Sequence, residues 1–129
     1  MIKAKKSLGQ NFLVDRNILE KITNITQITD KTILEIGPGT GNLTSFILKK
    51  KPKKIFVVEK DENLANYLKE TFKDQLTIIN DDVLKINESL LFKSKVTVFG
   101  NLPYNISTEI LSKWITNSSK DLWFNNLIL

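Results

Sequence analysis

One stretch of the sequence combines an acidic residue with alternating glycines. An apolar run leads into Glu35, and Gly37, Gly39 and Gly41 then occupy every second position. This pattern predicts a buried strand, a tight turn that lets backbone approach a ligand, and a helix that begins at the same point. The dinucleotide fingerprint G-x-G-x-x-G does not fit, because it requires glycine where the chain has Asn42.

A carboxylate at the end of this strand favours a ligand that carries a cationic amine over one that carries a pyrophosphate. S-adenosylmethionine is such a ligand, because it has an ammonium, a sulfonium and an adenosine but no phosphate. The alternative is a strand-to-helix turn that uses glycine for its geometry alone.

Two further acidic residues follow the next apolar runs. Glu59 lies about twenty residues beyond the glycine turn, where an acidic side chain can accept both ribose hydroxyls of a nucleoside. Asp82 can accept a hydrogen bond from an adenine amine, while the backbone N–H of Val83 faces a ring nitrogen. The alternatives are a solvated carboxylate at Glu59 and a helix N-cap at Asp82, and Asp81 is a rival for the adenine contact.

The sharpest chemical signal is the sequence Asn101-Leu102-Pro103-Tyr104. Proline fixes the turn and removes a backbone donor, so that backbone carbonyls can point outward. The side-chain oxygen of Asn101 and the carbonyl of Leu102 can then hold the two hydrogens of an exocyclic amine. Tyr104 offers a face on which the base can stack. A turn with a buried tyrosine is the alternative for these four residues taken alone.

The elements that must position these residues alternate along the chain. Apolar runs predict strands at 32–36, 54–59, 76–79, 95–99 and from 122 onward. Helical periodicity and caps predict helices after Asp15, over 43–50, after Asp61, over 84–91 and over about 107–117. Short connections between alternating strands and helices predict an α/β fold with a mostly parallel sheet and helices on both faces. The ligand of such a sheet lies beyond the carboxyl ends of its strands, where the candidate residues fall.

Two of these elements carry sharper expectations. The helix after Asp15 is expected to bury an apolar face at helical spacing, formed by Ile18, Leu19, Ile22 and Ile25. The continuous apolar run 55–58 predicts a strand that is buried on both faces.

Composition excludes several kinds of chemistry. The 129 residues suffice for one domain with one sizeable core. Histidine and cysteine are absent, so Ser-His and Cys-His catalysis, disulfides and thiolate or imidazole metal sites are excluded, and no metal is predicted. No apolar stretch approaches the length of a membrane span, which makes a cytoplasmic protein the expectation. The net charge of +5 is compatible with a nucleic-acid partner.

Five segments together resemble the ribosomal RNA adenine dimethyltransferase family of the KsgA type, whose relatives include the Erm methyltransferases. They follow the family's order and are the N-terminal motif 6–13, the cofactor loop 35–41, the ribose segment 58–61, the adenine segment 80–84 and the catalytic motif with its flank, 98–107. This resemblance replaces the capping turn that local pattern favours for residues 10–13.

The resemblance implies a Rossmann-like methyltransferase fold with S-adenosylmethionine as its cofactor. It also implies that the reaction dimethylates adenines in small-subunit ribosomal RNA, on the immature small ribosomal subunit. A monomer is expected. The residues that line the cofactor site by resemblance are Asn11, Leu13, Gly37, Glu59, Asp82 and Asn101. The same resemblance implies that Asn101, Leu102 and Tyr104 hold the target adenine.

The expected domain organisation departs from the family pattern. Residues 1–14 form a basic arm with the N-terminal cofactor motif, and residues 15–129 form a catalytic domain that stops in its fifth strand. The family's C-terminal helical domain, which helps engage RNA, is absent. A non-catalytic RNA-binding or assembly module, an inactive fragment and an Erm-type large-subunit enzyme are therefore alternatives. A small-molecule or protein methyltransferase fits the glycine turn but leaves 101–104 unexplained.

Overall fold

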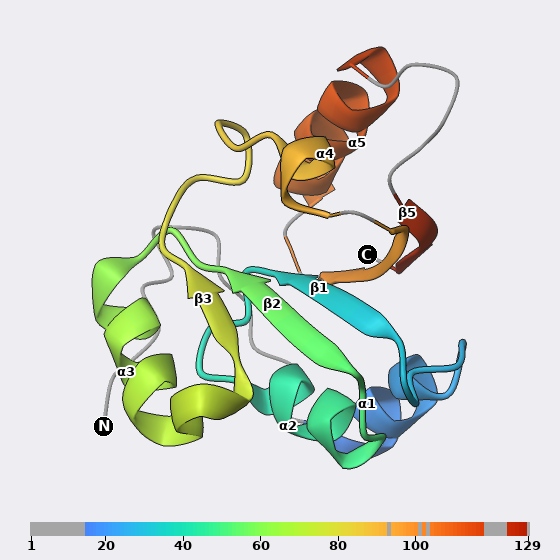
Figure 1. Ribbon diagram of the computed structural model, residues 1–129, viewed down its shortest axis with the longest axis vertical. Helices are drawn as coiled ribbons and strands as arrows, with labels where there is room; N and C mark the ends of the chain where they lie inside the picture. The colour runs from blue at the N-terminus through green and yellow to red at the C-terminus, as the bar shows by residue number, and fades with distance from the viewer. Residues whose placement is uncertain (1–14, 93, 101, 103, 118–123, 129) are drawn as a thin grey trace.

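A computed structural model of the protein describes residues 15–92, 94–100, 102, 104–117 and 124–128. These residues form a five-stranded parallel sheet in the order β3-β2-β1-β4-β5 (Figure 1). In chain order the strands are β1 (Thr32–Ile36), β2 (Lys54–Val58), β3 (Thr77–Ile79), β4 (Val96–Gly100) and β5 (Phe124–Ile128). The α/β class predicted from the alternating pattern is confirmed.

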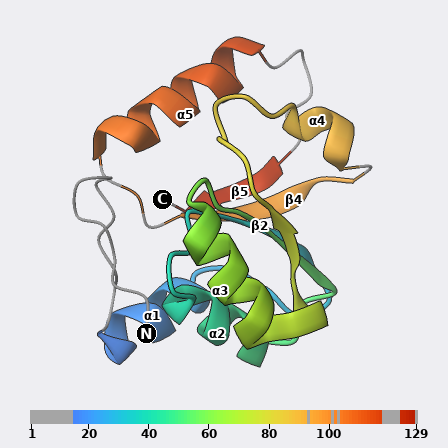
Figure 2. The ribbon, with the colours of Figure 1, turned by 90° about the vertical axis from the view of Figure 1, so that its left-hand side faces the viewer.

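Helices cover both faces of this sheet. They are α1 (Arg16–Thr23), α2 (Asn42–Lys49), α3 (Glu62–Phe72), α4 (Glu88–Leu91) and α5 (Tyr104–Asn117), with a 3-10 turn η2 (Lys73–Gln75) after α3. Helices α1, α2 and α3 lie on one face, and α4 and α5 lie on the other (Figures 1 and 2). In the part of the chain described here, no helix is long and apolar enough to cross a membrane.

Each face of the sheet buries its own apolar cluster. Successive side chains of a strand point to opposite faces, so Ile33 joins the cluster under α1, α2 and α3, whereas Leu34 joins the other. The second cluster also contains Ile110 and Trp114 of α5, which are 0% and 2% exposed. The strand β1 is therefore buried on both sides, as a central parallel strand requires.

Aspartate caps begin two of the helices, as the sequence predicts. Asp15 accepts a hydrogen bond from the backbone N–H of Asn17 at 2.9 Å, and Asp61 accepts one from that of Asn63 at 2.8 Å. Such caps satisfy backbone donors that have no partner within the helix. The helix α2 begins differently, because Gly41 precedes it and supplies no side-chain cap.

The apolar face predicted for the first helix is wrong at two of its four positions. Ile18 is 42% exposed and Ile25 is 64% exposed. The helix ends at Thr23, so Ile25 lies beyond it and no longer follows the helical period. The buried residues of α1 are Leu19 and Thr23, which are four positions apart and share one face.

The prediction that the second strand is buried on both faces is also wrong in part. Lys54 is exposed and Phe56 is half-buried. The ring of Phe56 packs edge-on against that of Phe92, with 5.0 Å between the ring centroids, and the Lys54 ammonium lies 4.8 Å from the Phe56 centroid. On the side of β2 that carries Phe56, the strand is therefore covered by the ring of Phe92 and the side chain of Lys54.

Two helix boundaries also differ from expectation. The helix predicted over 84–91 is confined to Glu88–Leu91, because the preceding residues form a turn in which Lys85 N–H donates to the Asp82 carbonyl at 2.8 Å. The helix α5 begins at Tyr104 rather than near Ser107.

The strand ends lie in one row. Ile36 of β1 is paired with Val58 of β2 and with Gly100 of β4, and Val58 is paired with Ile79 of β3. Each of these residues ends its strand. The segments that follow the four strands therefore leave the sheet at the same edge.

Candidate active site

The glycine turn occupies the centre of this edge. Gly37, Gly39 and Gly41 have φ angles of 65°, 60° and 91°, values that favour glycine. The turn is fixed by hydrogen bonds from Gly37 N–H to the Val58 carbonyl at 2.9 Å and from Gly41 N–H to the Pro38 carbonyl at 3.0 Å. The sequence prediction of a tight turn between strand and helix is confirmed.

A second segment closely approaches this turn. A Cβ atom built on Gly37 would lie 2.6 Å from Cδ2 of Leu102, so the leucine occupies the space that any larger residue at 37 needs. Two segments about 65 positions apart in the sequence, the glycine turn and the stretch after β4, therefore touch at the sheet edge. Asn101 and Pro103, and the side chain of Tyr104, lie outside the described residues.

Glu59 connects the end of β2 to the glycine turn. Its Oε1 accepts a hydrogen bond from Gly39 N–H at 3.2 Å, and its Oε2 accepts one from Asp61 N–H at 3.0 Å. The residue is 1% exposed, and burial raises the pKa of this carboxyl above its ordinary value. A carboxylate has more lone pairs than these two hydrogen bonds use, so Glu59 can also accept ribose hydroxyls. That role stays a prediction for this residue.

Glu35 occupies a different environment. Its side chain is 1% exposed and accepts a hydrogen bond from the hydroxyl of Thr44, in the first turn of α2. Burial raises the pKa of the Glu35 carboxyl to about 8, and the nearby Glu59 charge adds to the rise. The observed role of Glu35 is to join β1 to α2, and its predicted contact with a cationic amine stays a prediction.

Asp82 forms the turn that follows β3. Its Oδ1 accepts a hydrogen bond from Leu84 N–H at 3.0 Å, and its Oδ2 lies 3.6 Å from the ammonium of Lys60. The next residue, Val83, is 8% exposed and packs into the apolar cluster under α5. The capping role and the adenine role remain compatible, because the carboxylate is only partly buried and retains free lone pairs.

Asn80 links the segments that follow β2 and β3. Its side-chain amide donates to the carbonyls of Glu59 and Lys60, at 2.9 and 3.2 Å. The segments after β2 and β3 are therefore tied together directly. The sequence interpretation grouped Asn80 with the adenine segment but assigned it no contact.

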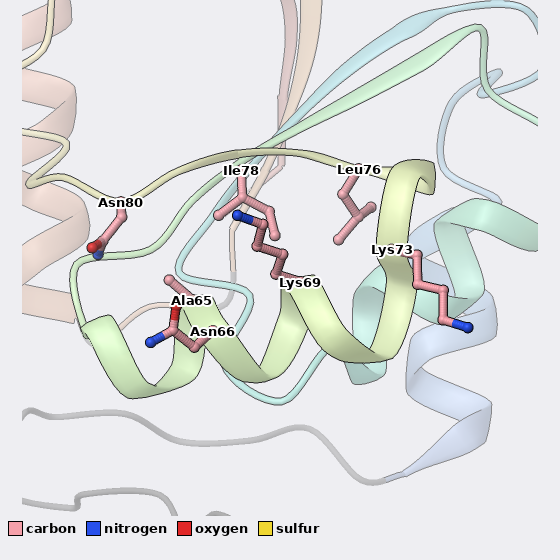
Figure 3. Close-up of a pocket in the computed structure, with 7 residues that line it drawn as sticks. All are labelled: Ala65, Asn66, Lys69, Lys73, Leu76, Ile78 and Asn80. Atoms are coloured by element: carbon pink, nitrogen blue, oxygen red, sulfur yellow. The ribbon is translucent and has the colours of Figure 1, made fainter.

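A hollow of about 260 Å³ lies beside Asn80, between α3 and the edge strand β3 (Figure 3). Lys69 extends from α3 toward Ile78, whereas Asn80 lies at the end nearest the strand ends. The other lining residues are Ala65, Asn66, Lys73 and Leu76. This hollow is at the border of the sheet and shares Asn80 with the candidate site.

Sequence reasoning missed one polar cluster. Lys113 and Trp114 of α5 bind Glu88 of α4, and the sequence analysis assigned a role to none of these three residues. The one available signal was a lysine placed beside the buried positions Ile110 and Trp114 of an otherwise apolar helix face. The N-terminal candidates Asn11 and Leu13 lie outside the described residues.

Comparison with known proteins identifies the family. A model of the family described as "Ribosomal RNA adenine dimethylase" matches residues 1–125. The chain belongs to this family. The resemblance drawn from the five motifs is therefore confirmed.

Curated relatives in the ribosomal RNA adenine dimethylase family are longer than this chain. The protein named "Ribosomal RNA small subunit methyltransferase A" from Pelagibacter ubique is 66% identical over 128 residues, which are 99% of this chain and 49% of the relative. The protein of the same name from Mesomycoplasma hyopneumoniae is 47% identical over 126 residues, covering 97% of this chain and 46% of the relative. The chain thus spans about half the length of the curated relatives it matches.

Solved structures show the Rossmann-like methyltransferase fold. A dimethyladenosine transferase from Plasmodium falciparum has a TM-score of 0.71 and 28% identity, covering 91% of this chain and 42% of that one. The 23S rRNA methyltransferase ErmE has a TM-score of 0.70 and 26% identity, covering 81% of this chain and 43% of that one. The fold predicted for this member of the ribosomal RNA adenine dimethylase family is confirmed.

Proposed function

We propose that this protein transfers methyl groups from S-adenosylmethionine to the exocyclic amine of adenines in small-subunit ribosomal RNA, twice for each adenine. The observation that carries the proposal is the contact between Leu102 and the Gly37 turn, in a chain that belongs to the ribosomal RNA adenine dimethylase family. This contact puts the residues proposed to hold a target base beside those proposed to hold the cofactor.

The groups at the strand ends fit this cofactor. Glu59 and Asp82 provide acceptors for ribose hydroxyls and for an adenine amine, and the glycine turn lets backbone approach a ligand. A phosphate group at Glu59 is disfavoured, because two anionic groups would lie together. When bound, S-adenosylmethionine supplies a methyl group on a sulfonium, which is already a strong electrophile.

The chain's own residues bind and orient the target base and accept hydrogen bonds from its amine. In our proposal the side-chain oxygen of Asn101 and the carbonyl of Leu102 accept the two N–H groups of the target amine, which bends the amine out of conjugation and aims its lone pair. Tyr104 stacks on the base, and Pro103 fixes the turn. The amine loses its proton to water after methylation, so no histidine is needed. Positioning therefore supplies most of the catalysis.

The N-terminal motif completes the proposed cofactor site through Asn11 and Leu13, within a basic arm formed by residues 1–14. The chain's partner is then the immature small ribosomal subunit in the cytoplasm, where an unpaired or flipped-out adenine can enter the pocket. We propose that it acts as a monomer and without a metal ion. In the curated relatives the chain corresponds to about half of the protein, and we assign RNA engagement in part to the other half.

Methyl transfer from labelled S-adenosylmethionine to unmethylated small and large ribosomal subunits tests the proposal, with the RNA digested to nucleosides. We expect label in dimethyladenosine from small subunits only. Label from large subunits alone would point to the Erm-type reaction. Binding of RNA without any labelled nucleoside, by a chain that also binds the cofactor, would support a non-catalytic assembly module and contradict the proposal.

Asn101→Ala is the matched variant for this assay. The substitution removes one of the two proposed acceptors of the target amine, so we expect turnover to fall by about 100-fold while the affinity for S-adenosylhomocysteine changes little. Turnover is measured under saturating cofactor. If Asn101→Ala methylates small subunits at the normal rate, the proposed hold on the amine is wrong.

A further inference from the structure

Lys113 forms a compact polar cluster beneath the turn that carries the candidate adenine contacts. Its ammonium donates to the carbonyl of Val83 at 2.5 Å and to that of Ile86 at 2.6 Å. It also lies 3.2 Å from both carboxylate oxygens of Glu88, whose Oε2 accepts a hydrogen bond from the indole N–H of Trp114 at 2.6 Å. An ammonium has three donors, and all three are used.

This cluster is shielded from solvent. The side chain of Lys113 is 17% exposed and that of Glu88 is 4% exposed, while Trp114 is 2% exposed. A charge in such a place is costly unless it is paired and hydrogen-bonded, and here it is both. Figure 2 shows α4 and α5 on the same side of the sheet, with the segment between β3 and α4 rising toward them. The lysine therefore joins these three parts of the chain.

Two of the three donors of Lys113 bind main-chain carbonyls rather than a side chain. These carbonyls belong to the turn that begins at Asp82, so the ammonium fixes the path of that turn. The Val83 side chain packs into the same apolar cluster as Leu102, which contacts Gly37. The turn after β3 is thus held in place both by its backbone carbonyls, which bind Lys113, and by the side chain of Val83.

We propose that Lys113 is a positioning residue, which holds the Asp82–Val83 turn in place for the adenine end of the cofactor and ties it to the helix that begins at Tyr104. The inference rests on the proposed function, because it assigns the turn to the cofactor. Glu88 and Trp114 keep the ammonium oriented. The helix that follows the target-base segment thereby also controls the shape of the cofactor site.

The test compares wild type with Lys113→Met and with the double variant Glu88→Gln/Lys113→Met. The double variant removes both charges together, so it leaves no buried charge without a partner and folds even where the single variant does not. We measure the Kd of S-adenosylhomocysteine and of methylthioadenosine, which shares the adenine and ribose. We expect both Kd values to rise about tenfold in both variants, because ligand binding must then order the Asp82–Val83 turn that Lys113 no longer holds.

A matched control is Lys50→Met. The Lys50 ammonium also bonds a carboxylate and an amide, those of Glu20 and Asn24, at 2.9 and 2.8 Å, but it joins α1 to α2. We expect this variant to bind both ligands as wild type does. Amide hydrogen exchange provides a readout independent of activity, because the N–H groups of Leu84 and Lys85 should exchange faster in the Lys113 variants only.

Each outcome decides between the two proposals. Wild type that binds neither ligand overturns the proposed function and this inference with it. Wild type that binds both, together with Lys113 variants of unchanged affinity, overturns the inference and leaves the function standing. An equal loss of affinity in Lys50→Met shows that the effect is one of general stability, which also overturns the positioning role.

Discussion

Glu35 and Glu59 are both buried acidic residues, but they differ in the hydrogen bonds that their carboxyl groups accept. Glu59 accepts two backbone N–H groups, which favour its charged form, whereas Glu35 accepts only the Thr44 hydroxyl among the contacts described. Burial without compensating donors raises the pKa of Glu35 to about 8. At neutral pH Glu35 is therefore mostly protonated, and it acts as a neutral link between β1 and α2.

Glu35 predicts a pH dependence of stability. A carboxyl whose pKa is higher in the folded state than in the unfolded state binds its proton more tightly when folded, so the free energy of unfolding falls as pH rises from about 4.5 toward about 8. The loss is at most on the order of 4 kcal/mol. We expect Glu35→Gln to flatten this slope in urea unfolding measured at pH 5, 6, 7 and 8. A slope that is the same in wild type and variant would contradict the raised pKa.

Glu59 supports a prediction about affinity. Glu59→Ala removes the proposed acceptor of the ribose hydroxyls and releases Gly39 N–H, so we expect binding of S-adenosylhomocysteine to weaken by roughly 1.5–3 kcal/mol. Titration calorimetry measures this change. The control is Glu20→Ala, which removes an exposed carboxylate paired with Lys50 on the helices α1 and α2. Unchanged affinity in Glu59→Ala would refute the ribose role.

Among the elements, the glycine turn couples backbone conformation to packing. Gly41 has a φ of 91°, and a Cβ atom built on it would lie 2.5 Å from the ring of Phe72 in α3. We expect Gly41→Ala to destabilise the fold by about 2–4 kcal/mol, because it adds backbone strain to overpacking. Thermal and urea unfolding measure the loss. Gly41→Ala combined with Phe72→Leu relieves the contact but not the strain, and recovers only part of the stability.

The order of elements was predictable from the sequence, because strands such as 32–36 and caps such as Asp15 and Asp61 are local signals. The convergence of Glu59 and the glycine turn followed from the rule for parallel sheets. The cluster around Lys113 could not be predicted, since its partners lie 25 to 30 positions away and depend on how α5 packs. The exposure of Ile25 was missed because periodicity alone does not show where a helix ends.

In the whole molecule, the candidate site lies where the two apolar layers meet the row of strand ends. Glu59, the glycine turn and Leu102 follow the ends of three different strands, and the pairing of those strands in the sheet brings them together. A ligand that binds there is bound by the folded chain and not by the unfolded one. Cofactor binding and global stability are therefore linked thermodynamically.

This linkage gives a prediction that also tests the choice of cofactor. At a concentration of 100 times its Kd, S-adenosylhomocysteine should add about 2.7 kcal/mol to the free energy of unfolding and raise the Tm by about 10 °C for a chain of this size. The dinucleotide NAD should leave the Tm unchanged, because the chain has Asn42 where the dinucleotide fingerprint requires glycine. Differential scanning fluorimetry measures both. A shift with NAD as large as that with S-adenosylhomocysteine would mean that the turn after β1 recognises a dinucleotide, and the proposed choice of cofactor would then be wrong.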